Sequence, residues 1–509
     1  MLDATESLAN SNNDDNDNEN GREFIALIAD PSEKVTMSVD EAIERLGMGK
    51  FQWRIFMTVG LCSSADAIQV LILSYLSVVL KSEWDLSSAQ ASLITSSVFV
   101  GAMFGSVLFG PLADRIGRRP TLLLAAIMIA LFGVLTSTTS SYVVLLSLLS
   151  MVGVGVGGLT VPYDTLAEYL PNSYRGASLL AVNYFWTFGS MLALLAAYVS
   201  LQRFHSWRFM IVATSIPCWI SAIVGWFAVP ETPRWLVANQ KSSQALQTLR
   251  QAAKTNGLDE MAVFPPGTEL LVEEEEQASF QDLLLPKWRW IILNLAGVWA
   301  SFGLLYYGTI LSITVVFQKE DSNTGKLDFD YMAMLTSASA ELFGVTAVIL
   351  TVDRWGRIPS QAWPYLVGGF CAGAMCIGST TITMTDKHTW LLAALAFGAR
   401  LCLMGASCVT WIITPELLTT EVRATGHGVV NAMARITGSL SPFVVQGGSS
   451  RLVTGLILVA FSILATVCVC QLPETAGKAM GGVAEEEYQQ VNDNDNGEDR
   501  LDRIEETEC

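Results

Sequence analysis

Long apolar segments recur along almost the whole chain of 509 residues, and they constrain its fold more than any other feature. A helix needs about 20 consecutive apolar residues to cross a bilayer, and only helices or closed barrels can satisfy their backbone hydrogen bonds there. The alternating decamers of barrel strands are absent. The sequence therefore predicts an all-α membrane protein with twelve spans, at roughly 53–80, 88–112, 120–139, 142–166, 177–200, 208–229, 290–316, 331–352, 361–383, 390–413, 424–446 and 452–472.

The net charge of −18 is concentrated at the two ends of the chain. Residues 1–50 contain twelve acidic and four basic residues, and residues 481–509 contain eleven acidic and two basic residues. Tails this rich in Asn, Asp and Glu are expected to be disordered, because they contain too few apolar residues to form a core. The sequence has no basic patch of the kind that binds nucleic acid, so no nucleic-acid partner is expected. The expected partner of the apolar segments is the lipid bilayer.

Three motifs occur twice in the same order. "DRIGRRP" at 114–120 returns as "DRWGRIP" at 353–359, and "EYLPNSYR" at 168–175 returns as "ELLTTEVR" at 416–423. "PET" follows the last span of each set. The repeat predicts two pseudo-symmetric six-helix halves, an arrangement that many secondary transporters use.

The repeat also sets the expected domain boundaries. They are an acidic, mostly disordered tail (1–50), an N-terminal bundle (51–230), a linker with a short amphipathic helix (231–288), a C-terminal bundle (289–473) and an acidic tail (474–509). Lys and Arg are more frequent in the loops on the side of the two tails, so both termini are expected in the cytosol. "EFIALI" at 23–28 fits an acidic dileucine-type sorting signal, and the choice between a vesicle or other endomembrane and the plasma membrane stays open.

The chain resembles the major facilitator superfamily over about residues 50–475, through "GPLADRIGRRP", "PETPRWL" and the doubled Glu-x6-Arg motif. "GMGKFQWRIF" and "TPELLTTEVRATGHGVVNAMARITGSLSPF" further resemble the synaptic vesicle 2-related protein group, near the organic cation and anion transporters. Some family features differ. The loop at 318–330 is short, no "QQ" pair opens the seventh span, and "ELF" at 341–343 replaces the usual "EFP".

Four ionisable residues lie near the middle of predicted spans: Asp66, Glu341, Arg400 and Arg435. A charge at the bilayer centre costs about 2.5–3.5 kcal/mol on insertion scales, so each is expected to have a use or a partner. The resemblance places these four helices around a central cavity. Asp66 is the candidate proton-coupling residue, because a carboxyl at the edge of an apolar cavity can bind and release a proton. The alternative is an Asp that only packs one helix against another.

Arg435 has no charged counterpart in the first half, where Thr187 occupies the equivalent position. With Asp66 protonated, the four charges favour an anionic ligand, and an Arg fork suits a carboxylate. The resemblance also favours an anionic substrate, since related organic-ion transporters that carry anions typically have Arg at the position of Arg435. Glu341 and Arg400 can instead neutralise each other as a structural pair. The other candidate substrate-binding residues are Gln69, Trp186, Tyr306, Tyr307 and the repeat-related Asn183 and Asn431.

The charged loop motifs predict a gate on the cytosolic side. Ion pairs that exist in one conformation and break in another make a two-state element. In the first half the candidates are Asp114, Arg115, Arg118, Arg119, Glu168 and Arg175. In the second half they are Asp353, Arg354, Arg357, Glu416 and Arg423. The alternative is that these residues only fix the orientation in the membrane.

The prediction is a monomeric secondary transporter of a small organic anion, such as a carboxylate, that works by alternating access with proton coupling. The alternatives are a cation, zwitterion or sugar transporter of the same fold, and a transport-dead sensor or trafficking protein. A channel is disfavoured because no filter motif or ring of charges occurs. No nucleophile–base pair or metal cluster suggests an enzyme, and no cofactor is expected.

Overall fold

The computed structural model describes residues 35–158, 160–271, 280–320, 327–382 and 389–477. The described chain is almost entirely helical, and a helix coincides with each of the twelve predicted spans. The first six are α3 (Lys50–Glu83), α4 (Ser88–Ile116), α5 (Arg118–Thr136), α6 (Tyr142–Gly157) continued by α7 (Thr160–Ala167), α8 (Asn172–Tyr198) and α9 (Trp207–Ala228). The last six are α13 (Pro286–Val316), α14 (Tyr331–Trp355), α15 (Arg357–Gly378), α16 (Thr389–Leu417), α17 (Thr420–Gln446) and α18 (Arg451–Cys470).

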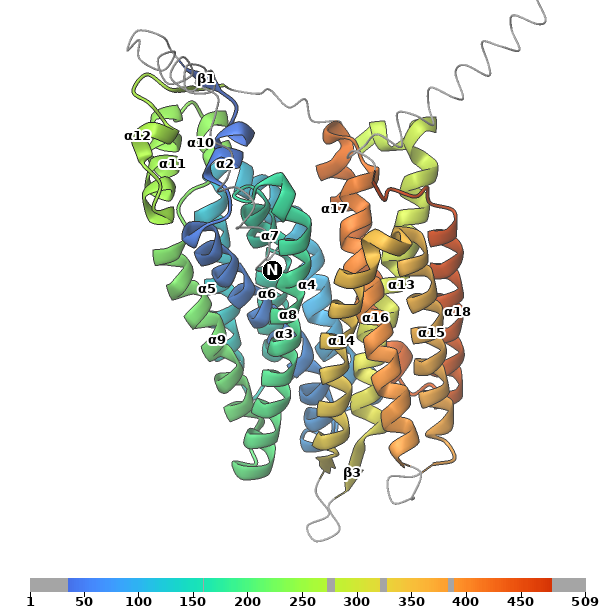
Figure 1. The fold of residues 1–509 in the computed structure, drawn as a ribbon. Coiled ribbons are helices and arrows are strands. Elements are labelled where there is room, and N and C mark those ends of the chain that lie inside the picture. The colour runs from blue at the N-terminus through green and yellow to red at the C-terminus, as the bar shows by residue number, and fades with distance from the viewer. Residues whose placement is uncertain (1–34, 159, 272–279, 321–326, 383–388, 478–509) are drawn as a thin grey trace, which may run out of the picture.

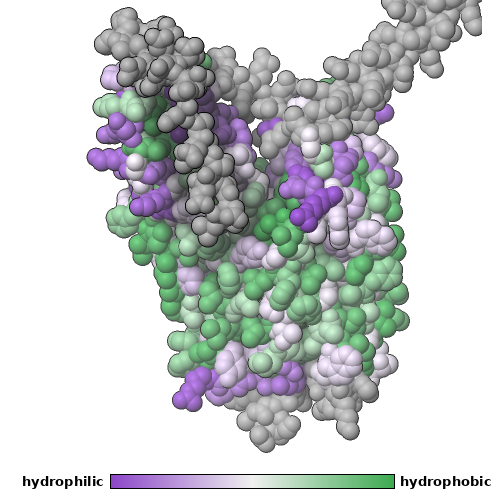
Figure 2. Space-filling model, viewed as in Figure 1, coloured by the Kyte–Doolittle hydropathy of each residue, from purple (hydrophilic) through white to green (hydrophobic). Residues whose placement is uncertain are grey.

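Within the described residues, ten of these helical segments are long and apolar enough to cross a membrane. The helices α15 and α17 coincide with the other two predicted spans. Figure 2 shows a broad apolar band around the visible face, with hydrophilic residues gathered at both ends of the molecule. The prediction of an all-α membrane fold is confirmed.

The helices form two bundles side by side, α3–α9 and α13–α18, which we call the N-terminal and C-terminal halves (Figure 1). Across the interface, α4 packs against α17 and α8 packs against α14. We call the end that carries α10–α12 the linker end and the end that carries β3 and β4 the loop end. The two bundles diverge toward the linker end and approach each other toward the loop end (Figure 1).

The glycine-rich runs of the N-terminal half lie at a close helix contact. A Cβ added to Gly153 of α6 would lie 2.1 Å from the carbonyl oxygen of Val98 in α4. A Cβ added to Gly105 of α4 would lie 2.1 Å from the carbonyl oxygen of Val154 in α6. Small residues let helix backbones approach in this way, so these glycines allow α4 and α6 to pack closely.

The linker folds against the N-terminal half at the linker end. It contains α10 (Pro233–Ala238), α11 (Ser242–Asn256), α12 (Glu260–Val263), β2 (Glu269–Leu270) and the 3-10 helix η2 (Phe280–Leu284). The helix α11 is the predicted amphipathic helix, and it buries Ala245, Leu249, Ala252 and Ala253 on one face. The last segment, η2, packs against α13 and α17 of the other half.

Part of the region predicted as an N-terminal tail is ordered. The strand β1 (Thr36–Met37) pairs in parallel with β2, and α2 (Val39–Leu46) buries Ala42, Ile43 and Leu46. Asp40 of α2 forms ion pairs with Arg234 and, at 4.0 Å, with Arg175. The acidic composition concealed this short apolar face. The sorting-signal candidate at 23–28 and the C-terminal acidic run lie outside the described residues.

At the loop end, β3 (Gln318–Glu320) and β4 (Leu327–Phe329) form an antiparallel pair between α13 and α14. The π-helix η1 (Val199–Arg203) extends α8 at the same end. Gln202 of η1 donates a hydrogen bond to Asp328 of β4. Strand β4 is thereby connected to the N-terminal half as well as to its own.

Candidate functional site

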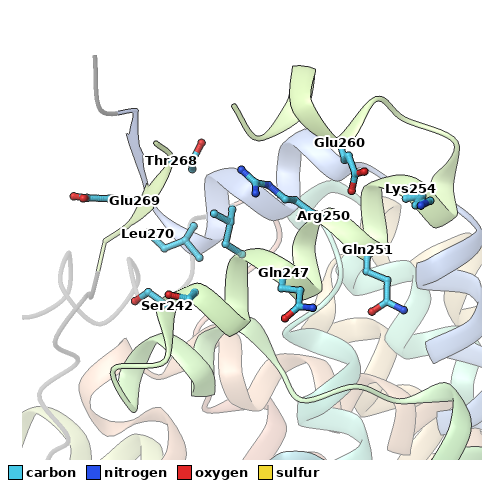
Figure 3. Close-up of a pocket in the computed structure, with 11 residues that line it drawn as sticks. Ser242, Gln247, Arg250, Gln251, Lys254, Glu260, Thr268, Glu269 and Leu270 are labelled. Atoms are coloured by element: carbon cyan, nitrogen blue, oxygen red, sulfur yellow. The ribbon is translucent and has the colours of Figure 1, made fainter. Parts of the chain in front are cut away.

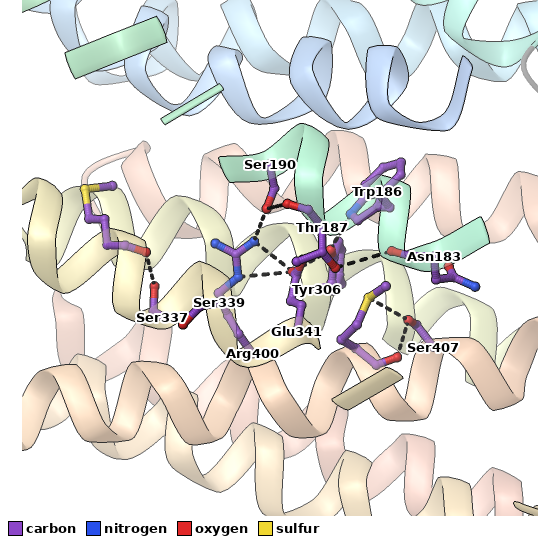
Figure 4. A network of polar contacts seen from close by, with 12 residues as sticks. Asn183, Trp186, Thr187, Ser190, Tyr306, Ser337, Ser339, Glu341, Arg400 and Ser407 are labelled. Carbon is purple, nitrogen blue, oxygen red and sulfur yellow. Dashed lines mark hydrogen bonds and ion pairs between the residues drawn. The ribbon is translucent and has the colours of Figure 1, made fainter. Parts of the chain in front are cut away.

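Glu341 of α14 and Arg400 of α16 form a buried ion pair in the middle of the C-terminal half (Figure 4). Arg400 Nη2 lies 2.8 Å from Glu341 Oε1, and Arg400 Nε donates to the same oxygen at 3.1 Å. Glu341 is fully buried and Arg400 is 5% exposed. Since removing a charge from water costs several kcal/mol, each residue depends on the other as a counterion.

Aromatic and hydroxyl side chains extend this pair across the interface (Figure 4). The Tyr306 hydroxyl of α13 donates to Glu341 Oε1 at 2.8 Å, and Trp186 Nε1 of α8 donates to the Tyr306 hydroxyl at 2.6 Å. Arg400 Nη2 also reaches Ser190 Oγ of α8 at 3.5 Å. A polar network therefore connects the C-terminal half to α8 of the N-terminal half. Ser190 was not predicted, because a serine in a span carries no signal of its own.

The other two mid-span charges also lie at the interface. Asp66 of α3 and Arg435 of α17 are close enough to interact electrostatically, and Tyr307 of α13 interacts with both. Arg435 is 7% exposed. Within the described chain, Asp66 Oδ1 and Arg435 Nε are buried and accept or donate no hydrogen bond. Polar atoms of this kind are unusual in a native interior and indicate a position that a ligand or water can occupy.

Three other predicted site residues form no side-chain hydrogen bond to these four charges within the described chain. Gln69 donates to the Thr214 carbonyl oxygen of α9 at 3.3 Å, so it joins two helices of one half. Asn183 donates to the Leu180 carbonyl oxygen of its own helix at 3.1 Å. Asn431 is buried in α17 at 6% exposure.

An aromatic group that was not predicted occupies the linker-end side of these charges. The Trp411 ring of α16 packs against Trp299 at 4.8 Å and His427 at 5.3 Å between ring centroids. Tyr163 of α7 stacks on Trp411 at 5.9 Å. This stack crosses between the halves. Only tertiary structure brings these four residues together, since they come from four different helices.

The predicted gate residues of the N-terminal half meet at the linker end. Arg118 Nη1 lies 2.9 Å from Asp114 Oδ1, and Arg118 Nε lies 3.1 Å from Glu168 Oε1. Arg119 instead donates to the Trp226 carbonyl oxygen at 2.8 Å, and Arg115 is exposed. Arg175 contacts Asp40 rather than the Asp114 cluster.

The C-terminal half repeats this arrangement. Arg357 Nη1 lies 2.8 Å from Asp353 Oδ1, and Arg357 binds both carboxylate oxygens of Glu416, at 3.1 and 3.2 Å. Arg423 donates to the carbonyl oxygens of Pro415 and Leu418, and Arg354 is exposed. In both halves these ion pairs connect helices of the same half.

The repeated "PET" motif caps the helix that follows each charged loop. Glu231 accepts from the backbone N–H of Arg118 at 2.8 Å, and Glu474 accepts from that of Arg357 at 2.7 Å. The intervening Gly117 and Gly356 have φ of 109° and 88°, which L side chains rarely adopt. A Cβ on Gly117 would also lie 2.2 Å from Glu231 Oε2. The "DRxGR" and "PET" motifs are therefore two parts of one local structure.

A cavity of about 900 Å³ lies on the linker (Figure 3), and none of the four mid-span charges lines it. It is lined by α11, α12 and β2, with Arg250, Lys254 and Glu260 among its side chains. Because both charge signs line it, its electrostatics select no ligand class. Within the described residues, no group of three or more His, Cys, Asp or Glu is arranged to hold a metal ion.

The model of the sugar (and other) transporter family matches residues 63–486. The chain belongs to this family of the major facilitator superfamily. It is therefore a membrane transporter and not an enzyme.

Two similar proteins show the range of this transporter's relatives. It is 31% identical to the synaptic vesicle 2-related protein of Bos taurus, over 89% of this chain and 84% of that protein. It is 28% identical to organic cation/carnitine transporter 7 of Arabidopsis thaliana, over 87% of this chain and 95% of that protein. The predicted resemblance to the synaptic vesicle 2-related group is confirmed.

Solved structures give the same fold. The transporter superposes on a partially occluded inward-open conformation of the xylose transporter XylE from E. coli with a TM-score of 0.68. The two are 19% identical, over 84% of this chain and 99% of XylE. At this identity the match shows the major facilitator fold and leaves the substrate open.

Proposed function

We propose that the transporter moves a small organic anion, such as a carboxylate, coupled to protons and by alternating access. The observation that carries the proposal is the pair of interfacial charges with buried, unsatisfied atoms, Asp66 and Arg435. Arg435 offers guanidinium N–H groups to an anion, and Asp66 offers a carboxyl that competes with that anion for the same cation. Protonation of Asp66 would release Arg435 for the substrate.

The aromatic side chains around this pair supply the apolar part of the proposed site. Tyr307 interacts electrostatically with both Asp66 and Arg435, and its ring packs against Phe99 of α4 at 4.6 Å between centroids. Both halves therefore contribute to one site, as alternating access requires. Tyr306, whose ring packs against Tyr307, would then connect this site to Glu341, because its hydroxyl donates a hydrogen bond to that carboxylate and accepts one from Trp186.

The linker end is proposed to face the cytosol, with both termini on that side, in a vesicle or other endomembrane. The orientation rests on the Lys and Arg clusters of the loops. The proposed location in a vesicle or other endomembrane rests on similarity to the synaptic vesicle 2-related proteins. The paired clusters around Arg118 and Arg357 are proposed as the cytosolic gate.

A cation or zwitterion is the second candidate. A relative is named as an organic cation/carnitine transporter. In this chain Asp66 and Glu341 are the carboxylates that would hold an amine, but Glu341 is bound to Arg400 and Tyr306.

Uptake into proteoliposomes tests the proposal. Labelled benzoate, nicotinate and succinate would be compared with tetraethylammonium and glucose, with protein-free liposomes giving the passive entry. We expect an acid-outside gradient to stimulate uptake of at least one carboxylate, and Asp66→Asn to remove the stimulation while exchange without a gradient persists. Asp85→Asn makes the same change in an exposed loop and should behave as wild type.

Two results would contradict the proposal. Preferential uptake of tetraethylammonium would reject an anionic substrate. Equal gradient stimulation in wild type and Asp66→Asn would reject the proton-coupling role of Asp66.

A further inference from the structure

A small cavity lies between the halves, on the loop-end side of the Glu341–Arg400 pair. It has a volume of about 10 Å³ and is lined by Ser74, Tyr75, Ser190, Thr314, Met334 and Arg400, among others. These residues come from α3 and α8 of one half and from α13, α14 and α16 of the other. Because both halves form its walls, any separation of the halves at the loop end enlarges it.

Two hydrogen-bond donors at this cavity lack a strong acceptor. Arg400 uses Nε and Nη2 for Glu341 and Ser190, and no acceptor for Nη1 is found in the described part of the chain. In Figure 4 this remaining guanidinium nitrogen points away from Glu341, toward the side where Ser337 lies. Tyr75 is 4% exposed, and its hydroxyl donates to the Met334 thioether sulfur at 3.9 Å. Sulfur of this kind is a weak acceptor.

The remaining hydroxyls of the cavity already direct their protons elsewhere. Ser74 donates to the Leu71 carbonyl oxygen at 2.8 Å, and Ser190 donates to that of Thr187 at 2.9 Å. Thr314 donates to Ser74 Oγ at 3.0 Å. The donors without a strong acceptor in the described chain are therefore Arg400 Nη1 and the Tyr75 hydroxyl, a combination that suits the two oxygens of a carboxylate.

Phe329 of β4 separates Tyr75 from the loop end. The Phe329 and Tyr75 rings pack edge-on, with centroids 5.5 Å apart, and Phe329 is 1% exposed. Tyr331, next to β4, packs similarly against Tyr198 of α8 at 5.1 Å. Tyr75 therefore lines the cavity and, through its ring, also contacts Phe329 of β4.

We propose that this cavity is the closed form of an outer anion subsite, in which Arg400 Nη1 and the Tyr75 hydroxyl bind the carboxylate of the substrate before it reaches Arg435. Glu341 positions Arg400 for this purpose by holding its other two nitrogens. The substrate enters from the loop end once the halves separate there and Phe329 leaves Tyr75. This inference rests on the proposed anionic substrate and adds a second binding position on its path.

Equilibrium binding of radiolabelled benzoate to the purified full-length transporter tests the subsite. Tyr75→Phe removes the hydroxyl and keeps the ring against Phe329, so folding should be preserved. We expect it to weaken benzoate binding about tenfold, the order of a hydrogen bond to a charged group. The matched control is Tyr331→Phe, which removes a buried hydroxyl without a hydrogen bond in the described chain and should bind as wild type.

Arg435→Gln separates the two positions. If the outer subsite exists, this variant retains residual benzoate binding that Tyr75→Phe weakens further. If Tyr75→Phe binds as wild type and Arg435→Gln alone abolishes binding, the outer subsite is overturned and the proposed function stands. If wild type binds no benzoate and takes up tetraethylammonium instead, the proposed function fails and the inference fails with it.

Discussion

Glu341 and Arg400 differ from the other mid-span charges in how completely they depend on each other. Glu341→Gln would leave the guanidinium of Arg400 buried without its counterion. We expect this variant to lose about 3–5 kcal/mol of stability, as measured when one partner of a buried ion pair is removed. Thermal unfolding of the detergent-solubilised transporter measures the loss.

The double variant Glu341→Gln/Arg400→Gln is the control for this prediction. It removes both charges, so it should recover much of the stability that Glu341→Gln loses. If Glu341→Gln is as stable as wild type, Glu341 is not the main counterion of Arg400 in the folded protein.

Single residues also mark how far sequence alone could define the site. The depth of Asp66, Glu341, Arg400 and Arg435 follows from span length, because a charge ten residues into an apolar helix must lie near its middle. The hydrogen-bond and ion-pair partners of these residues cannot be predicted from span length, because they depend on which face each helix turns toward its neighbours. Gln69 illustrates this, since it lies one turn from Asp66 yet bonds to α9.

Among the helices, α5 and α15 begin in the same way but differ in the acidity of the residue that caps them. Burial raises the pKa of Glu231 above its usual range, although backbone N–H groups of Thr232, Arg118 and Arg119 act against it. For Glu474, burial acts to raise the pKa, but hydrogen bonds from four backbone N–H groups outweigh it and lower the pKa. The contributions of these two capping residues to stability should therefore respond to acid in opposite directions.

The sign follows from linkage. A carboxyl with a lowered pKa stabilises the fold above its unfolded pKa of about 4.3, and this stability is lost as the pH falls through the lower folded value. A carboxyl with a raised pKa instead gains stability as the pH falls from neutral toward about 4.3. We expect Glu474→Gln to lower the melting temperature at pH 7, with the difference shrinking below about pH 4.

Glu231→Gln is the matched variant for that measurement. It should be nearly neutral at pH 7 and should remove a small gain in melting temperature that wild type shows between about pH 7 and pH 5. Parallel pH profiles for the two variants would contradict this assignment of the caps.

Short elements were harder to predict than helices. Apolar length and the repeat predicted twelve helices and the amphipathic α11, because each signal extends over many residues. The strands β1 and β2 are each two residues long and carry no alternation that could be read from sequence. The short helix α2 was missed because acidic neighbours dominate its composition.

At the scale of the whole molecule, hydrogen bonds connect the halves toward the loop end. Ser96 Oγ of α4 donates to the Ser439 carbonyl oxygen of α17 at 2.6 Å, and Gln446 of α17 donates to Ser77 of α3 at 3.0 Å. If transport requires these contacts to break, linking them should stop it. We expect Ser96→Cys/Ser439→Cys, joined through two disulfide bonds by a short bis-methanethiosulfonate reagent, to lose carboxylate uptake and to regain it after reduction of those disulfides.

Wild type treated with the same reagent is the control, because the chain has nine native cysteines. Each single-cysteine variant should also keep its uptake. Uptake that continues in the linked double variant would show that transport does not need the halves to separate at the loop end.

The pairing of β1 with β2 joins Thr36 to Glu269 and has a consequence for biosynthesis. A ribosome makes the chain from its N-terminus, so the partner of β1 emerges only after all six helices of the N-terminal half have been made. Until then β1 has no strand to pair with, and α2 has no α11 to pack against. The strand β1 and the helix α2 thus come first in the described chain and yet are among the last elements of their half to acquire a fixed position.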